Sequence, residues 1–146
     1  METSSKSSRW SEHTIRRRVQ FYELDSAGIV HFSNYFRYME EAEHALWRAA
    51  GLSISPPDAS VGFPRVNVAF DYRRPLRFED EVDIRIRIVK LSRRTIQYAC
   101  TLRTGNVLAA EGVMTIVCVR MGVDPLEAVS IPEAIASRFE AVAADA

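Results

Sequence analysis

The sequence predicts an α+β fold in which an antiparallel sheet of about five strands wraps around one long central helix. Apolar side chains recur at three- and four-residue intervals across residues 35–49, which is the pattern of an amphipathic helix. Further along, between residues 66 and 120, apolar and polar side chains alternate, which is the pattern of half-buried strands. Short turn segments separate these strands, so we expect antiparallel neighbours with the helix covering one face.

The chain begins with residues 1–12, which are rich in serine and charge, and we expect them to form a flexible arm. A single domain over residues 13–146 follows. Its first strand is predicted to begin at the arginines 16–18 and to continue through alternating residues as far as Tyr22. These arginines resemble a nucleic-acid-binding arm, but no second basic element accompanies them, so a solvated strand is the favoured interpretation.

The long helix is predicted to start near Tyr35 and to end at Gly51, which can adopt a left-handed conformation there. Ser33 or Asn34 can cap its start. Its apolar stripe is formed by Tyr35, Met39, Ala42, Leu46 and Ala49, and is widened by Phe36 and Trp47. Its solvated stripe is formed by Arg37, Glu41, His44 and Arg48.

Four strands are predicted after the helix, separated by turns that contain glycine, proline, asparagine or aspartate. We expect them over residues 66–72, 82–88, 96–102 and 107–120. The Asp124-Pro125 pair ends the last of them. Ser130, Pro132 and Glu133 suit the start of a short terminal helix that continues to Val142.

The composition bounds the class of protein. A chain of 146 residues with formal net charge zero is long enough for one core and lacks the basic excess that is typical of nucleic-acid-binding proteins. No apolar run is long enough to span a bilayer, and the polar first residues do not resemble a signal peptide. Cys100 and Cys118 are expected to be reduced thiols in the cytoplasm, with a disulfide between them as the less favoured alternative. No Cys/His cluster has metal-ligand spacing.

The residues before the helix are unusual for a connector. Asp25 lies at a strand end, and Gly28 allows a sharp turn before the helix begins. A carboxylate is therefore expected beside a helix N-terminus, where free N–H groups and the helix dipole can stabilise an oxyanion. The alternative is that Asp25 only accepts hydrogen bonds within its own turn.

The segment from Asp25 to Glu40 matches the pattern D-x-A-G-[IV]-V-x-[FYH]-x-N-Y-x-x-[YW]-x-[ED]. In this it resembles the 4-hydroxybenzoyl-CoA thioesterase family of hot-dog-fold proteins, which includes the YbgC-type acyl-CoA thioesterases. With the strands that follow, the resemblance covers roughly residues 14–133. It implies a hot-dog fold and hydrolysis of an acyl-CoA thioester, with the CoA thioester as substrate and no separate cofactor.

The resemblance also implies roles for individual residues. The carboxylate of Asp25 would attack the thioester carbonyl or activate a water molecule that does so. Backbone N–H groups of His31, Phe32 and Ser33, at the helix start, would stabilise the oxyanion that forms. Gly28 would shape the turn between them.

Three further positions have two interpretations each. Some YbgC-type members carry a functional histidine where this chain has Phe32, so His31 either orients water or the acyl group, or fills a slot that other members fill with an aromatic residue. Glu40 occupies the position that contacts the far end of the acyl group in the hydroxybenzoyl branch, or it pairs on the helix surface with His44. Gly62 borders the pocket or is a simple turn glycine.

CoA carries phosphates, and Arg93 with Arg94 match a basic run that contacts the nucleotide in the hydroxybenzoyl enzyme. The alternative is that they are exposed hairpin residues, and Arg73 with Arg74 are weaker candidates for the same role. Proteins of this type assemble as dimers, often paired into tetramers, with sites at the subunit boundary. A non-catalytic acyl-CoA-binding protein on the same scaffold is the competing function.

Overall fold

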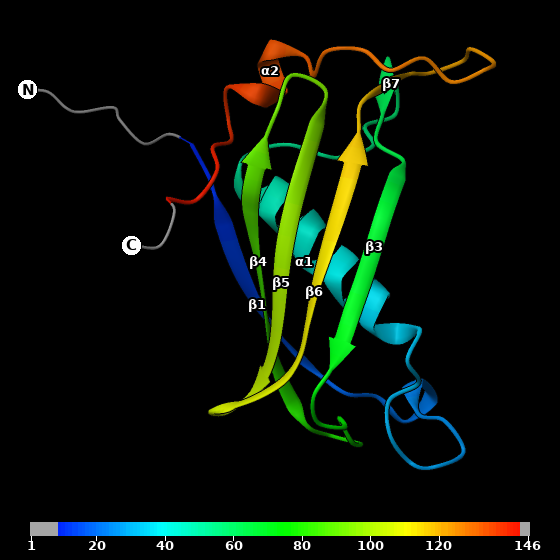
Figure 1. Ribbon diagram of the computed structural model, residues 1–146, viewed down its shortest axis with the longest axis vertical. Coiled ribbons are helices and arrows are strands. Elements are labelled where there is room, and N and C mark those ends of the chain that lie inside the picture. Colours follow the sequence, from blue (N-terminus) through cyan, green and yellow to red (C-terminus); the bar gives the residue numbers. More distant parts are fainter. Residues whose placement is uncertain (1–8, 144–146) are drawn as a thin grey trace, which may run out of the picture.

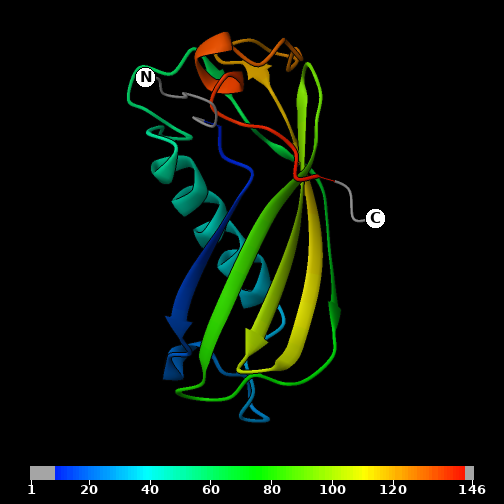
Figure 2. The same cartoon turned by 90° about the vertical axis from the view of Figure 1, so that its left-hand side faces the viewer.

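The computed structural model describes residues 9–143. One antiparallel sheet with the strand order β1-β4-β5-β6-β3 curves along the central helix α1 (Figure 1), which lies against one face of the sheet (Figure 2). The elements in chain order are β1 (Glu12–Arg18), the 3₁₀ helix η1 (Phe21–Glu23), α1 (Asn34–Ala49), β2 (Val61–Gly62), β3 (Arg65–Tyr72), β4 (Glu81–Leu91), β5 (Thr95–Thr104), β6 (Val107–Val117), β7 (Val119–Arg120) and α2 (Glu133–Ala136). The predicted α+β fold with a five-stranded sheet is confirmed.

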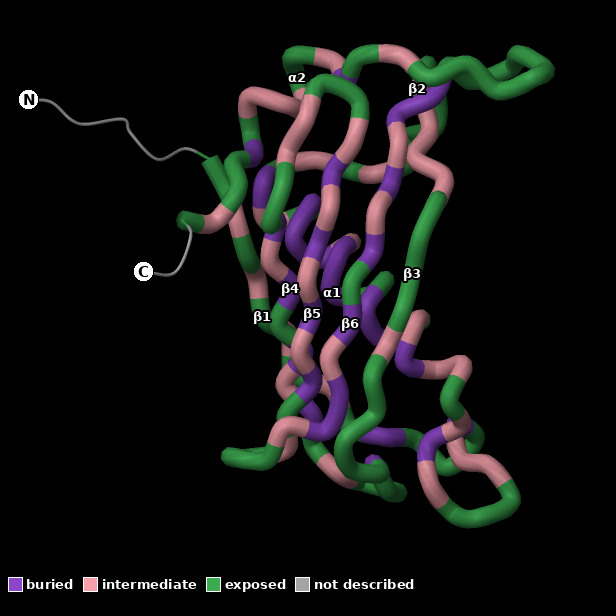
Figure 3. The backbone as a smooth tube through the Cα atoms, viewed as in Figure 1, coloured by how far each residue is buried: buried purple, intermediate pink, exposed green. Residues whose placement is uncertain are grey.

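The core lies between α1 and the three central strands, where buried backbone segments of both layers face each other (Figure 3). In β4, buried isoleucines alternate with more exposed charged residues, as the period of a half-buried strand requires. On α1, the predicted apolar stripe is buried at Tyr35, Met39, Ala42 and Leu46. The indole Nε1–H of Trp47 donates a hydrogen bond of 3.0 Å to the Tyr98 hydroxyl, which ties α1 to β5.

The sequence predicts the C-terminal end of α1 correctly, but it does not predict the capping at the N-terminal end. Gly51 has a φ of +82° directly after the helix, as predicted. At the start, neither Ser33 nor Asn34 makes a side-chain cap. The Ser33 hydroxyl lies 2.9 Å from Nδ1 of His31, and the Asn34 side-chain amide donates to the carbonyl of Glu23 at 2.9 Å. Both polar side chains therefore hold the preceding loop instead of the helix.

The first strand is shorter at its C-terminal end than predicted. It ends at Arg18, and the residues that seemed to continue its alternation form η1, with Phe21 and Tyr22 exposed. The backbone N–H of Gln20 donates to the Glu23 carboxylate at 2.9 Å, and this local bond turns the chain out of the sheet.

Both chain ends also differ from the predictions. The strand β1 already begins at Glu12, and Trp10 pairs with Phe139 in an isolated bridge, so residues 9–12 are part of the domain. Residues 1–8 of the expected arm lie outside the described residues. The predicted terminal helix to Val142 is only the single turn α2, because Phe139 leaves the helical path and packs fully buried against Trp47.

The strand β3 is an edge of the sheet, and most of its residues are exposed. Its alternating pattern predicts the strand correctly, but Val66, Val68 and Tyr72 remain 59%, 41% and 46% exposed. Figure 3 shows this strand almost entirely as exposed backbone. An unpaired edge that carries apolar side chains is a surface to which another chain can add.

The two cysteines are free and buried, as expected for reduced thiols. Burial raises the pKa of the Cys100 thiol to about 12, so this side chain packs as an uncharged group at neutral pH. Within residues 9–143, the structure contains no helix that combines the length and apolarity needed to cross a bilayer.

Candidate active site

Asp25 begins a tight turn that its own carboxylate stabilises. The backbone N–H of Asp25 donates to the Ile29 carbonyl at 2.8 Å, and that of Gly28 donates to the Asp25 carbonyl at 3.0 Å. One carboxylate oxygen, Oδ1, accepts from the N–H of Ala27 at 2.8 Å and of Ile29 at 3.4 Å. These bonds leave the second oxygen, Oδ2, without a partner among the described residues, so one oxygen holds the turn while the other is free for chemistry.

A cavity of about 370 Å³ opens beside this turn. It is lined by Asp25, Ile29, Val30, Phe32 and Tyr35, and by residues 72–75 at the end of β3. Tyr72 packs edge-on against Tyr35 with the ring centroids 4.8 Å apart, and its hydroxyl donates to the Phe32 carbonyl at 3.2 Å. The cavity therefore combines aromatic walls with one carboxylate.

Of the three backbone N–H groups at the helix start, one is available to a ligand. The N–H of His31 donates to the Glu23 carbonyl at 2.8 Å, and that of Ser33 donates to Nδ1 of His31 at 3.2 Å. None of the hydrogen bonds in the described part of the chain uses the N–H of Phe32. Phe32 also lines the cavity, so among the three predicted oxyanion donors its N–H is the one that is unpaired in the described residues and belongs to a cavity-lining residue.

His31 is occupied with local structure. Its Nδ1 interacts with the Ser33 hydroxyl at 2.9 Å, and its ring stacks on Phe32 with centroids 4.6 Å apart. The residues that line the cavity include Phe32 but not His31. This geometry favours the interpretation in which His31 fills an aromatic slot and supports the helix start.

Glu40 and Gly62 lie away from Asp25 in the same chain. Glu40 lines a second cavity of about 370 Å³ and accepts from Arg65 at 3.3 Å, so its ion-pair partner is Arg65 and not the expected His44. Gly62 belongs to β2 and lines a third cavity of about 160 Å³. Both cavities include Arg65, at the opposite end of β3 from Tyr72.

The two arginine pairs occupy opposite ends of the sheet. Arg73 and Arg74 line the Asp25 cavity, and Arg73 is paired with Glu111 at 2.7 Å. Arg93 and Arg94 lie in the turn between β4 and β5, far from the Asp25 turn in Figure 1. Within one chain, the arginines beside Asp25 are therefore Arg73 and Arg74, the weaker candidates for contact with the CoA phosphates.

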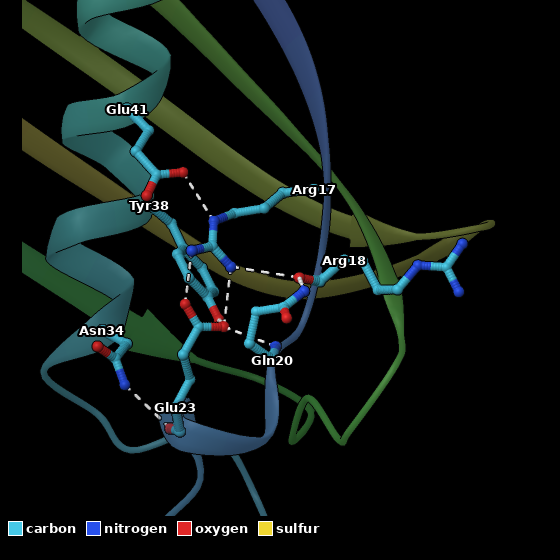
Figure 4. A network of polar contacts seen from close by, with 7 residues as sticks. All are labelled: Arg17, Arg18, Gln20, Glu23, Asn34, Tyr38 and Glu41. Carbon is cyan, nitrogen blue, oxygen red and sulfur yellow. Dashed lines mark hydrogen bonds and ion pairs between the residues drawn. The ribbon is translucent and has the colours of Figure 1, made fainter.

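Two buried carboxylates escaped the sequence prediction, because Glu is ordinarily a surface residue. Glu23 is 4% exposed and lies among Arg17, Gln20 and Tyr38 near the start of α1 (Figure 4). Glu43 is fully buried and paired with Arg65. For Glu43, burial raises the pKa of the carboxyl group, although Arg65 opposes this. The burial of Glu43 could have been predicted from its place on the helix, since it lies next to Ala42 on the buried stripe.

Comparison with known proteins identifies the family. A model described as the thioesterase-like superfamily matches residues 19–139. A 1,4-dihydroxy-2-naphthoyl-CoA hydrolase of Nostoc punctiforme is 26% identical over 108 residues, which are 73% of this chain and 73% of that protein. A protein of Aquifex aeolicus that carries the provisional name of an esterase is 41% identical over 85 residues, which are 58% of this chain and 66% of the relative. That match spans just under two thirds of the relative's length.

Solved structures agree with the sequence relatives. A hypothetical protein from Aquifex aeolicus superposes with a TM-score of 0.82 at 32% identity, covering 88% of this chain and 99% of that one. A gentisyl-coenzyme A thioesterase superposes with a TM-score of 0.77 at 29% identity, covering 84% of this chain and 98% of that one. The resemblance to hot-dog thioesterases is confirmed, and the chain belongs to the thioesterase-like superfamily.

Proposed function

We propose that this protein is an acyl-CoA thioesterase that hydrolyses a CoA thioester to the free acid and CoA, with Asp25 as nucleophile or general base. The observation that carries the proposal is the cavity lined by Asp25, by the aromatic residues Tyr35 and Tyr72, and by Phe32, whose N–H has no partner among the described residues. The names of its relatives point to the same chemistry. A cytoplasmic location is part of the proposal and is supported by the two buried free thiols.

The chemistry needs few groups. As a general base, Asp25 takes a proton from water, the water oxygen attacks the thioester carbon, and the carbon–sulfur bond breaks to release the CoA thiolate. As a nucleophile, Asp25 attacks the same carbon and expels the thiolate, and water then cleaves the resulting anhydride. In both routes negative charge develops on the carbonyl oxygen, which the N–H of Phe32 can stabilise. A thiolate is a good leaving group, so a strong acid is not required.

We propose an aromatic acyl group as the preferred substrate class. Tyr35, Tyr72 and Phe32 supply aromatic surface to the cavity, and such rings favour edge-on or offset contacts with another ring. The names of two relatives, a 1,4-dihydroxy-2-naphthoyl-CoA hydrolase and a gentisyl-coenzyme A thioesterase, also refer to hydroxylated aromatic acids.

The experiment that tests the function is a panel of acyl-CoA substrates with short, branched and aromatic acyl groups, followed by release of free thiol. Purified protein is expected to release thiol fastest from the aromatic substrates. Release from none of them, together with measurable binding of an acyl-CoA, would establish the competing non-catalytic function.

We further propose that the active unit is a homodimer, alone or as half of a tetramer, joined through β3. Antiparallel pairing of two β3 edges around a two-fold axis places the Arg65 end of one copy beside the Tyr72 end of the other. Gly62 precedes the Arg65 end, and the Arg93–Arg94 turn lies at the same end of the sheet, since Thr95 pairs with Val117 and Arg65 with Ile116. Asp25 of one copy would thereby lie near Gly62, Arg93 and Arg94 of the other, although these residues are far apart within one chain.

Light scattering on the purified protein is expected to give the mass of a dimer or tetramer, and Val68→Asp on β3 to halve that mass and to abolish hydrolysis. Val68 is an exposed apolar residue of the edge, and a buried unpaired charge opposes association. Val107→Asp, at the exposed first position of β6 and away from the β3 edge, is the matched control and should leave mass and activity unchanged. A monomeric wild-type protein with full activity would contradict the dimer.

Removing the charges of Arg93 and Arg94 together, by substitution with alanine, is expected to raise KM for acyl-CoA about tenfold. Hydrolysis of a short thioester without the nucleotide should change little, because the arginines would contact only the CoA phosphates. Arg85→Ala, on the outer face of β4 and paired with Glu12, serves as the control for loss of charge. Equal effects on both substrates would rule out nucleotide contact by this pair, and the double alanine variant of Arg73 and Arg74 then tests the alternative.

Gly28→Ala is expected to lower kcat and to destabilise the protein by about 1 kcal/mol. Gly28 has a φ of +81° with open space around it, so the added methyl group acts through backbone strain alone. Gly105→Ala, at a φ of +60° and equally open, should cost similar stability in urea unfolding but leave kcat unchanged. If both variants lower kcat equally, the shape of the Asp25 turn is not what matters.

A further inference from the structure

The side chain of Glu23 is saturated with hydrogen bonds although it lies only two residues before Asp25. Its Oε1 accepts from the backbone N–H of Gln20 at 2.9 Å, from Nη1 of Arg17 at 2.8 Å and from the hydroxyl of Tyr38 at 2.7 Å. Its Oε2 lies 2.6 Å from Nη2 of Arg17. Figure 4 shows these groups converging on the one carboxylate. A single side chain thus joins β1, η1 and α1.

The backbone carbonyl of Glu23 binds the loop that leads into α1. The Glu23 carbonyl accepts from the N–H of His31 at 2.8 Å and from the side-chain amide of Asn34 at 2.9 Å. Along the chain, Asp25 is two residues after Glu23, and Phe32 directly follows His31. Glu23 therefore fixes the start of the turn that carries the Asp25 carboxylate. It also fixes the loop that carries the Phe32 N–H, the proposed oxyanion donor.

We propose that Glu23 is a positioning residue for hydrolysis, which holds the Asp25 turn and the Phe32 N–H at a fixed separation by anchoring both to β1 and α1. The inference deepens the proposed thioesterase function and rests on it. Glu23 touches no reacting atom and acts through Asp25 and Phe32.

The turn needs such an anchor because its own tip is exposed. Ser26, Ala27 and Gly28 face solvent, and few buried contacts limit the motion of a segment of this kind. The anchor itself is rigid: Arg17 also pairs with Glu41 at 2.7 Å and lies over the Tyr38 ring at 4.5 Å from its centroid. Misplacement of a catalytic group by about 1 Å can lower the rate about a hundredfold, so a fixed stem matters for kcat.

The electrostatics of the cluster keep it intact at neutral pH. Burial disfavours the charged form of Glu23, but hydrogen bonds from Arg17, Gln20 and Tyr38 prevail and lower the pKa of this carboxyl group. Burial and the neighbouring Glu23 raise the pKa of the Tyr38 hydroxyl, which therefore stays a donor. The carboxylate and its donors are thus in their bonded states in the range where the enzyme would work.

Two variants test the proposal, Glu23→Gln and Tyr38→Phe, with Asp83→Asn as the control. Glu23→Gln is expected to lower kcat at least about tenfold and Tyr38→Phe about threefold, with KM within about twofold of wild type. Asp83 of β4 forms an exposed ion pair with Arg16 of β1, outside the Glu23 cluster, and its loss should change neither constant. A kcat that stays at the wild-type value in both variants would overturn the proposal.

Amide hydrogen exchange supplies a readout that does not depend on catalysis. In the variants, the amides of Ala27, Ile29 and His31 should exchange faster while those of β4 and β5 keep their protection. Uniformly faster exchange would mean that the cluster only stabilises the fold, and would also overturn the proposal. If wild-type protein hydrolyses no thioester, the proposed function fails, yet local exchange still decides whether Glu23 holds the turn. If Glu23→Gln does not fold, Tyr38→Phe decides alone.

Discussion

Replacing Asp25 with asparagine is expected to lower kcat for acyl-CoA hydrolysis about 100- to 10,000-fold, with unchanged stability. The asparagine oxygen can still accept from the N–H groups of Ala27 and Ile29, so the turn should keep its shape. What the variant loses is the charged oxygen that would attack the thioester or take a proton from water. Steady-state kinetics and thermal unfolding on the same preparation separate the two effects.

Ser26→Ala is the matched control for Asp25→Asn. Ser26 is exposed at the tip of the same turn, and its hydroxyl makes no hydrogen bond among the described residues, so kcat should stay at the wild-type value. An Asp25→Asn protein that keeps most of its activity would remove Asp25 from the reaction, whatever the control shows.

Arg65→Ala is expected to destabilise the protein by about 3 kcal/mol at neutral pH. Arg65 pairs with the fully buried carboxylate of Glu43, whose Oε2 has no hydrogen-bond partner among the described residues. Without the guanidinium, Glu43 must either remain as an uncompensated buried charge or take up a proton. Urea unfolding measures the loss.

The pH dependence of this loss follows from the Glu43 pKa. Burial raises the pKa of the carboxyl group above its unfolded value even with Arg65 present, and removal of Arg65 raises it further. A raised acid pKa means that the folded state binds more protons, so stability is retained below the unfolded pKa and is lost as pH rises through the folded pKa. Arg65→Ala should therefore be less destabilising at about pH 5 than at about pH 7.

Two comparisons make the Arg65 result specific. Adding Glu43→Gln to Arg65→Ala removes the buried charge and should recover part of the lost stability at neutral pH. Arg120→Ala breaks an exposed pair with Glu127 and should cost no more than about 1 kcal/mol. A loss for Arg65→Ala that equals this control, or that does not vary with pH, would contradict the account.

Local patterns predicted the elements well where a single repeat carries the information. The three- and four-residue spacing from Tyr35 to Ala49 identified the central helix, and Gly51 ended it as expected. Strand prediction succeeded for β4 and β5 for the same reason, because alternation directly reports one buried and one exposed face. The single strand expected over residues 107–120 was wrong at its end, since the chain divides there into β6 and β7, and β7 pairs with β2 in a separate two-stranded sheet. The spacing from Asp25 through Gly28 likewise predicted a tight turn before the helix, and the structure places that turn beside a cavity.

Predictions failed where another residue competes with a local preference. Ser33 and Asn34 are good caps in isolation, but His31 and the Glu23 carbonyl offer them other partners. The terminal helix stops after one turn, and Phe139, which follows it, is fully buried against Trp47. The Glu23 carbonyl and Trp47 are 11 and 92 residues away along the chain from the residues that they contact, so local patterns do not identify them.

By itself, the amino-acid sequence determined the central helix, most strands of the main sheet, the Asp25 turn and the family resemblance, because each depends on residues close together in the chain. Only the tertiary structure decided that Glu23 and Glu43 are buried, that Arg73 and Arg74 share the cavity with Asp25, and that Gly62, Glu40, Arg93 and Arg94 do not. The physical reason is that burial and charge pairing depend on which strands and helix faces meet. These contacts between strands and helix faces are decided by packing across the whole sheet.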